Sequence, residues 1–281
     1  MLRLTYSNYR VTMTSFTEWK PRDAARYITV PRESDDKYSR GVLGVITGSD
    51  KYPGAAVLGV EAALRTGVGM VRYLGPERAS NLVLARRPEA VTSDGRVQAW
   101  LIGSGTDHEG YKDKVAESAM AQGLPTVLDG GALELHSKAT GPLIITPHYR
   151  ELARILDADV EDIAAHPDHW ALTASEKLVA TVLLKGHSTY VAGGGMALRT
   201  RSAPTWLATA GAGDVLAGIL GSLVATHATK IDSDPRMLAR LAATASVIHG
   251  LAATRASAGG PATMLDVAAA VAPTIAGLLS S

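Results

Sequence analysis

The sequence predicts an α/β fold built on a central, mainly parallel β-sheet flanked by helices. Short apolar runs alternate along the chain with segments whose apolar residues recur every three or four positions. Strands separated by helices usually pair in parallel through right-handed crossovers. The 281 residues are 46% apolar, which is enough to bury one large core. No internal repeat or linker interrupts the pattern after about residue 35, so we expect one domain.

The predicted strands are short apolar runs bounded by glycine, proline or polar residues. They are Val42–Thr47, Met70–Leu74, Ala99–Gly103, Pro125–Asp129, Pro142–Thr146 and Val179–Lys185. The helices predicted between them have apolar residues at helical spacing. They are Gly54–Thr66, Glu109–Ala121, Glu151–Leu156 and Ala171–Lys177.

The pattern changes after Lys185. Thr189–Ala192 and Met196–Thr200 flank three glycines and predict a β-hairpin. From Asp214 onward the sequence predicts a mostly helical chain, with helices at Asp214–Thr226, Pro235–Ala256 and Met264–Leu279.

Composition and the chain ends narrow the classes of protein. A net charge of +1 argues against a generally basic surface for nucleic acid. The absence of cysteine excludes disulfides, thiolate metal sites and a cysteine nucleophile. Residues 1–35 are expected to form a loosely structured leader without the apolar core of a signal peptide, and residues 36–281 a single domain. Met264–Leu279 is short and contains Asp266, so we expect a packed helix, no membrane span and a cytoplasmic protein.

The strongest local signal is the loop Gly211-Ala212-Gly213-Asp214, which leads into a predicted helix. Glycines let backbone amides approach an anion, and the helix N-terminus adds positive potential, so Gly211, Ala212 and Gly213 could hold a transferring phosphoryl group. Asp214 could then take a proton from a substrate hydroxyl. Alternatively, Asp214 is only an N-cap and the glycines only a turn; spacing alone does not decide between these two interpretations.

The segment from Lys185 to Thr189 follows a buried strand. Its cation, exposed amides and hydroxyls could line the ribose and phosphates of a nucleotide. An ordinary β-turn with a solvated lysine explains the same residues, and taken alone that interpretation is favoured.

Further candidate residues also follow predicted strands, where parallel sheets bind their ligands. His148 comes after Thr146-Pro147, Gly105 lies in a glycine-containing loop, and Ala55 lies in the loop Gly48–Ala56. Taken alone, His148 is more readily explained as an exposed residue beside a helix that Thr146 caps. The Gly48–Ala56 loop could be only a connection. Asp129 ends another predicted strand and receives no role. The sequence lacks the P-loop, dinucleotide-binding, zincin and hydrolase-elbow motifs.

Five stretches, in this order, resemble the ADP- or ATP-dependent NAD(P)H-hydrate dehydratases of the ribokinase-like superfamily. They extend over nearly the whole chain from Lys37 onward and are specific when taken together. They are Lys37–Ser49, Tyr52–Arg72, Thr146–His148, Val182–Val191 and Ala208–Gly221.

The resemblance implies a ribokinase-like three-layer sandwich and a repair reaction. ADP-dependent dehydration of NADH-hydrate and NADPH-hydrate (the S epimers) would restore NADH and NADPH, releasing AMP and phosphate, with Mg²⁺ accompanying ADP or ATP. By position, Ala55, Gly105, His148 and Asp214 match substrate-contacting residues. The nucleotide-binding positions are matched by Lys185, Gly186, His187, Ser188, Thr189 and Gly213, and the base by Asp214. No resident metal site is implied.

The resemblance also implies a homo-oligomer, such as a tetramer, and a separate epimerase, because the epimerase domain fused to many bacterial members is absent here. Three segments depart from the family pattern: Gly103-Ser104-Gly105 is shorter, Tyr149-Arg150 replaces Pro-Gly, and Asp129-Gly130-Gly131 lacks one carboxylate. Two rival functions remain open. One is a kinase of the same superfamily that phosphorylates a hydroxymethyl heterocycle, and the other is a catalytically silent nucleotide-binding regulator.

Overall fold

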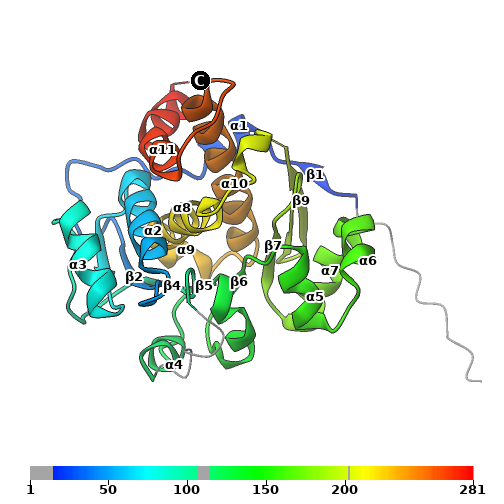
Figure 1. Cartoon of the computed structure of the whole chain (residues 1–281), viewed down its shortest axis with the longest axis horizontal. Coiled ribbons are helices and arrows are strands. Elements are labelled where there is room, and N and C mark those ends of the chain that lie inside the picture. Colours follow the sequence, from blue (N-terminus) through cyan, green and yellow to red (C-terminus); the bar gives the residue numbers. More distant parts are fainter. Residues whose placement is uncertain (1–14, 107–113, 202, 281) are drawn as a thin grey trace, which may run out of the picture.

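The computed structural model describes residues 15–106, 114–201 and 203–280. They form a three-layer α/β sandwich with a nine-stranded sheet in the middle (Figure 1). The predicted fold class is therefore confirmed. The strands run β1 Thr17–Glu18, β2 Val42–Ile46, β3 Met70–Tyr73, β4 Ala99–Ile102, β5 Thr126–Leu128, β6 Leu143–Ile145, β7 Thr181–Leu184, β8 Thr189–Gly193 and β9 Met196–Thr200.

The strand order across the sheet is β1-β9-β8-β7-β6-β5-β4-β2-β3. Pairing is parallel from β3 to β7, whereas β8 pairs antiparallel with both β7 and β9. The predicted hairpin is thus β8 and β9, joined at Gly194 and Gly195, which both have positive φ angles. Positive φ is a conformation that glycine adopts without strain.

Alternate residues of the strands face two separate apolar layers. In β2, Leu43 and Val45 lie in one core cluster, while Val42 and Ile46 lie in the other. Burial on both faces explains why these strands are continuous apolar runs in the sequence. The helices are α1 Pro21–Ala25, α2 Pro53–Thr66, α3 Glu77–Arg86, α4 Lys114–Met120, α5 Tyr149–Leu156, α6 Val160–Ala165, α7 Pro167–Leu178, α8 Ala212–Thr226, α9 Ala228–Ile231, α10 Met237–Ser257 and α11 Met264–Leu279, with 3₁₀ turns η1 Gly130–Lys138 and η2 Thr205–Leu207.

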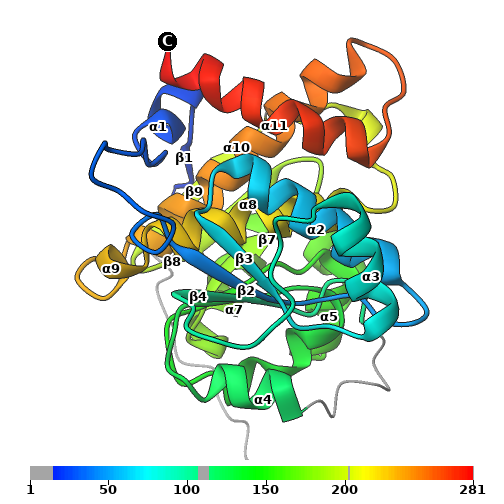
Figure 2. The same cartoon turned by 90° about the vertical axis from the view of Figure 1, so that its left-hand side faces the viewer.

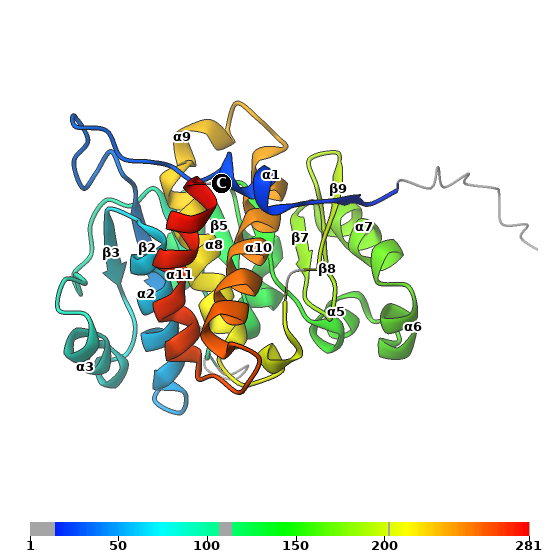
Figure 3. The ribbon, with the colours of Figure 1, turned by 90° about the horizontal axis from the view of Figure 1, so that it is seen from above.

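The first face of the sheet is covered by α2, α8 and α10, with α11 packed across α2 and α10 (Figures 2 and 3). The second face is covered by α4, η1, α5, α6 and α7. The long apolar helix α10 is, among the described residues, the one helix long and apolar enough to cross a membrane, and 83% of its most apolar window is buried in the fold. Packing in the core accounts for its apolar composition.

The prediction of a loose leader over residues 1–35 is wrong for residues 17–25, which form β1 and α1. β1 pairs in parallel with β9, and α1 packs against α10 and α11. The physical reason is aromatic burial: Trp19 and Tyr27 pack against the core, and Trp19 Nε1 donates to Thr244 Oγ1 at 3.2 Å. Residues 1–14 lie outside the described part of the chain.

Most predicted helices are present, with shifted ends. The helix predicted from Asp214 begins at Ala212, and the helix predicted over Glu109–Ala121 is observed from Lys114, since residues 107–113 lie outside the described part. The elements α1, α3, α6, α9, η1, η2 and β1 were not predicted; of these, α1, α6, α9, η2 and β1 have at most six residues each.

Candidate active site

Five strands end at the same edge of the sheet, and their following residues meet there. β2, β4, β5, β6 and β7 are neighbours that all run in parallel. The carboxyl ends of such strands form the usual binding edge of an open α/β sheet. The residues that follow these strands are Gly48, Ser104, Asp129, Thr146 and Lys185.

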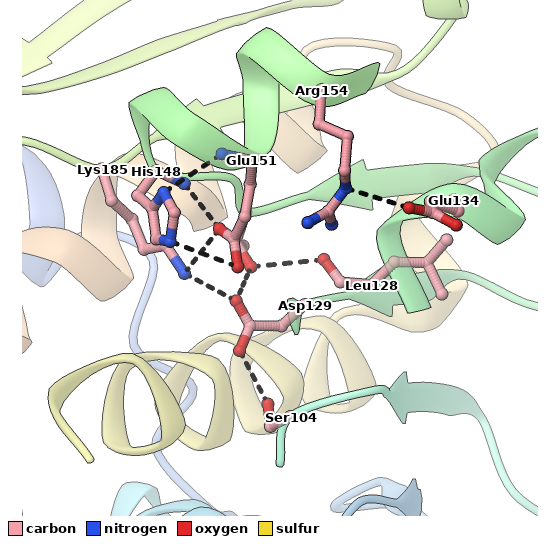
Figure 4. Close-up of polar contacts among 9 residues, drawn as sticks. Ser104, Leu128, Asp129, Glu134, His148, Glu151, Arg154 and Lys185 are labelled. Atoms are coloured by element: carbon pink, nitrogen blue, oxygen red, sulfur yellow. Dashed lines mark hydrogen bonds and ion pairs between the residues drawn. The ribbon is translucent and has the colours of Figure 1, made fainter. Parts of the chain in front are cut away.

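The centre of this edge is an ion pair between Asp129 and Lys185 (Figure 4). Lys185 Nζ donates to Asp129 Oδ1 at 2.8 Å. Two hydroxyls complete the contacts of the carboxylate, from Thr146 to Oδ1 at 2.6 Å and from Ser104 to Oδ2 at 2.9 Å. Burial opposes the charge of Asp129, but Lys185 and the hydroxyls outweigh it and hold the pKa of Asp129 below its usual value. Asp129 is therefore a carboxylate at neutral pH.

Helix α5 adds a second carboxylate from the other side of Lys185. Glu151 Oε2 lies 3.8 Å from Lys185 Nζ and accepts the backbone N–H of His148 at 2.8 Å. His148 caps α5 in return, because its Nδ1 accepts the Glu151 N–H at 3.2 Å. Burial opposes the charge of Lys185, but Asp129 and Glu151 hold the pKa of Lys185 above its usual value. The ammonium therefore stays charged between two carboxylates.

The N-terminus of α8 begins at this cluster. Its N-cap is Gly211 with φ of 90°, so Asp214 lies in the first turn of α8 rather than at the cap position. A Cβ atom at Gly213 would lie 3.5 Å from Lys185 Nζ and 4.0 Å from Asp129 Oδ2. The absence of a side chain at Gly213 thus leaves the ammonium directly next to the helix N-terminus, where backbone amides attract anions.

The surroundings of Asp214 shift its pKa upward. Burial raises the pKa of Asp214 to about 7; the negative charge of Asp129 adds to this shift and the Lys185 ammonium opposes it. A base whose pKa lies near the working pH combines availability with proton affinity. The alternative interpretation of Asp214 as an N-cap does not agree with its position in α8.

A cavity of about 590 Å³ opens beside the cluster. Its apolar walls come from the segment after β9 and from α8, and α10 contributes Ser246 and His249. Burial lowers the pKa of His249 to about 4, and Lys185 adds to the shift, so this imidazole is neutral at pH 7. The cavity brings together seven of the sequence-predicted site residues: His148, Lys185, Gly186, His187, Thr189, Ala212 and Gly213.

The other predicted site residues lie beside the cavity or away from it. Ser188 belongs to the same β7–β8 turn but does not line the cavity. Gly211 faces Leu58 of α2 and Met264 of α11. Ala55 and Gly105 lie next to each other, because a Cβ atom at Gly105 would overlap Ala55 Cβ.

Ala55 and Gly105 nevertheless belong to the same region of the fold. Gly59, one turn after Ala55 in α2, packs against the backbone oxygen of Asp214, which would lie 3.6 Å from a Cβ atom at Gly59. The Ala55 loop is therefore near the first turn of α8, on the side that α2 covers.

Sequence reasoning missed Asp129, Glu151 and His249 as site residues. The signal for Asp129 was its position at the end of a predicted strand, the same position that singled out Lys185. Glu151 could have been found from its spacing after His148, which forms a capping box. His249 carried no signal, because a histidine in an apolar helix is usually a core residue.

A sequence profile of the family described as NAD(P)H-hydrate dehydratase matches residues 43–271. The match covers most of the chain, including every segment that builds the site. The chain belongs to the NAD(P)H-hydrate dehydratase family. The bifunctional NAD(P)H-hydrate repair enzyme Nnr of Mycobacterium tuberculosis is 38% identical over 226 residues, which are 76% of this chain and 47% of that protein.

This family member is also similar to shorter proteins. The ADP-dependent (S)-NAD(P)H-hydrate dehydratase of Xanthomonas campestris is 30% identical over 72% of this chain and 78% of its own length. The chain spans about half the length of the mycobacterial relative. A Bacillus subtilis ADP/ATP-dependent NAD(P)H-hydrate dehydratase, co-crystallised with ATP and Mg²⁺, has the same fold, with a TM-score of 0.85, 22% identity and coverage of 94% of this chain and 99% of that chain.

Proposed function

We propose that this protein dehydrates the hydrated forms of NADH and NADPH in an ADP-dependent reaction. The observation that carries the proposal is the first turn of α8. Ala212 and Gly213 line the cavity and Gly213 borders the Asp129–Lys185 ion pair, while Asp214 in the same turn does not line the cavity but is influenced by both charges. Family membership supplies the substrate class, because the relatives are named for NAD(P)H-hydrate repair.

The cavity accommodates the nucleotide. Its volume of about 590 Å³ falls in the range of small-ligand sites. Leu207, Leu216 and Pro204 provide apolar surface for a base, while the turn after β7 provides amides and the Lys185 ammonium for phosphates. ADP would lie with its terminal phosphate at the N-terminus of α8. Mg²⁺ would accompany these phosphates; the bacillary relative was co-crystallised with ATP and Mg²⁺.

The reaction needs an activated leaving group, since hydroxide leaves poorly. Asp214 would take the proton of the ring hydroxyl, whose oxygen then attacks the terminal phosphorus of ADP and displaces AMP. The amides of Gly211, Ala212 and Gly213 would stabilise the charge on the transferring group. The C–O bond then breaks as the ring nitrogen donates its electron pair, which releases phosphate and leaves a ring iminium. Loss of a proton from the adjacent ring carbon to solvent then gives NADH or NADPH.

The hydrate would approach from the side of Ala55 and Gly105, with His148 at the edge of the cavity. We also infer a cytoplasmic location, a homo-oligomer (a tetramer by family resemblance) and joint action with an epimerase that interconverts the two hydrate epimers. Size-exclusion chromatography with light scattering measures the oligomeric state directly.

Incubation of the purified protein with (S)-NADH-hydrate tests the proposed function. The absorbance of reduced nicotinamide should rise only when ADP or ATP and Mg²⁺ are present. A stable phosphorylated product would indicate a kinase instead. The absence of turnover despite nucleotide binding would indicate a regulator.

A further inference from the structure

The Lys185 ammonium forms ion pairs with carboxylates other than Asp214. Two carboxylates near Lys185 are within ion-pair distance, Asp129 at 2.8 Å and Glu151 at 3.8 Å. Asp214 is not within 4.0 Å of that ammonium, although the structure describes both residues and the two charges influence each other. The cation therefore pairs with a residue outside α8 rather than with the base on α8.

The location of this cation is costly unless anions surround it. Lys185 Nζ lies against the first turn of α8, because a Cβ atom at Gly213 would be only 3.5 Å from it. A helix N-terminus carries positive potential, which repels an ammonium group. The ion pair with Asp129 offsets that repulsion. A phosphoryl group bound in the cavity that Lys185 lines would offset it as well.

The carboxylate of Asp129 is fixed in place by its own hydrogen bonds. It is 4% exposed, and its two oxygens accept hydrogen bonds from the hydroxyls of Thr146 and Ser104 as well as from Lys185. Ser104 and Thr146 follow β4 and β6, the strands on either side of β5. The carboxylate is fixed by the sheet, so the ammonium that it binds is fixed as well.

We propose that Asp129 is a positioning residue, which holds the Lys185 ammonium beneath Gly213 for a phosphoryl oxygen and keeps it from pairing with Asp214. This inference rests on the proposed function. Its consequence is that Asp214 remains free to accept a proton. If Lys185 were released, it would pair with Asp214 and make that carboxylate a weaker base.

Other charged groups around Asp214 do not replace Asp129 in this role. Burial keeps His249 of α10 neutral at pH 7. His148 and Glu151 of α5 cap each other beyond Lys185. On α2, Glu61 pairs with arginines, and on α11 Asp266 forms a capping box with Thr263.

Carboxyl ¹³C NMR of the full chain with labelled aspartate tests the proposal without any hydrate. The Asp214 resonance is assigned by its loss in Asp214→Asn. In the wild type it should titrate near pH 7, as its raised pKa predicts. In Asp129→Asn the titration should move down by about one pH unit or more, because the negative charge that raises the Asp214 pKa is lost and Lys185 then pairs with Asp214. The dissociation constant of ADP should rise about tenfold, since the ammonium leaves the phosphate position.

Ser104→Ala is the matched control, because it removes one hydrogen bond to Asp129 but no charge. It should leave the Asp214 titration within about 0.3 pH units of the wild type. An Asp129→Asn variant with unchanged Asp214 titration and unchanged ADP affinity would overturn the proposal. So would a wild-type Asp214 that titrates in the ordinary carboxyl range.

The double variant Asp129→Asn/Lys185→Met covers the case in which Asp129→Asn does not fold, since removing a buried ion pair as a unit is usually tolerated. Asp214 should still titrate near neutral pH in this variant, because burial remains and the competing ammonium is gone. If Asp214 instead titrates in the ordinary carboxyl range, the charge of Asp129 and not the position of Lys185 sets the pKa of Asp214. A wild type that fails to regenerate NADH would refute the proposed function but leave these titrations interpretable.

Discussion

Asp214 is the residue on which the proposed chemistry depends. It lies in the first turn of α8, is partly buried, and has Asp129 and Lys185 as its charged neighbours. These surroundings favour proton uptake over permanent ionisation. An aspartate with this pKa serves as a base at neutral pH, which an ordinary surface aspartate does poorly.

Asp214→Asn should abolish most of the turnover while leaving nucleotide binding intact. Asparagine keeps the size of the side chain but cannot accept the hydroxyl proton, and loss of a general base costs about 10²–10⁴-fold. Steady-state assays and calorimetry with ADP measure the two effects separately. Near-normal turnover in a folded Asp214→Asn protein would remove Asp214 from the mechanism.

The pH dependence of kcat/KM should report the same group. Because only the carboxylate form of Asp214 can take a proton, kcat/KM should rise with pH and level off above the pKa of about 7. The free energy of unfolding should change with pH in the opposite direction. Protonated Asp214 favours the native state below its ordinary pKa, and this contribution is lost as the pH rises through about 7. Thermal unfolding of Asp214→Asn should lack that loss, which comparison with the wild type from pH 4 to 8 would reveal.

At the scale of elements, the turn between β7 and β8 and the helices around it determine the shape of the cavity. Tyr149, the first residue of α5, places its hydroxyl against Gly186. Tyr149 is one of the residues that depart from the family pattern after His148. In this chain, therefore, α5 supports the turn between β7 and β8 through an aromatic side chain.

Gly186→Val should weaken ADP binding by about tenfold or more, because the loop must move to relieve the new contacts. A Cβ atom at Gly186 would overlap Tyr149 Oη and lie 3.1 Å from the Ser188 carbonyl oxygen. Gly277→Val is the control, since a Cβ atom there would meet nothing within 4 Å. Calorimetry that finds equal ADP affinity in both folded variants would place the nucleotide elsewhere.

Helices α2 and α3 are joined by a buried carboxylate. The side chain of Glu61 is fully buried and pairs with Arg65 at 2.7 Å, with Arg86 at 3.5 Å and with Arg87. Burial opposes the charge of Glu61, but Arg87 and Arg65 hold the pKa of Glu61 below its usual value. This cluster fixes α3 onto α2, the helix that carries Ala55.

Glu61→Gln should lower the free energy of unfolding by about 2 kcal/mol, less than for a fully buried pair because the arginines can regain water. Glu89→Gln is the control. Glu89 is half exposed and lies 3.6 Å from Arg87, so its loss should cost about 0–0.5 kcal/mol. Urea unfolding at pH 7 measures the free energy of unfolding of both variants. Equal destabilisation would mean that the buried Glu61 cluster contributes no more to stability than the exposed Glu89–Arg87 pair.

On the scale of the whole molecule, the sequence predicts the strands and helices that make up the layers. It does not predict which side chains from different strands meet. Val42–Thr47 and the other apolar runs predict strands because burial on both faces selects such residues. The order of the strands, and with it the meeting of Asp129 with Lys185, depends on crossovers that no local pattern encodes. Residues 17–25 were missed for a similar reason, since the contact of Trp19 with α10 spans 225 positions of the chain.

The path of one oxygen atom tests the central claim most directly. If Asp214 activates the ring hydroxyl for attack on ADP, that oxygen leaves with the phosphoryl group. Hydrate carrying ¹⁸O in its ring hydroxyl should therefore yield NADH, AMP and inorganic phosphate containing one ¹⁸O atom, as measured by mass spectrometry. Unlabelled phosphate, with the ¹⁸O released into water, would show that the hydroxyl departs without phosphorylation and would contradict the account.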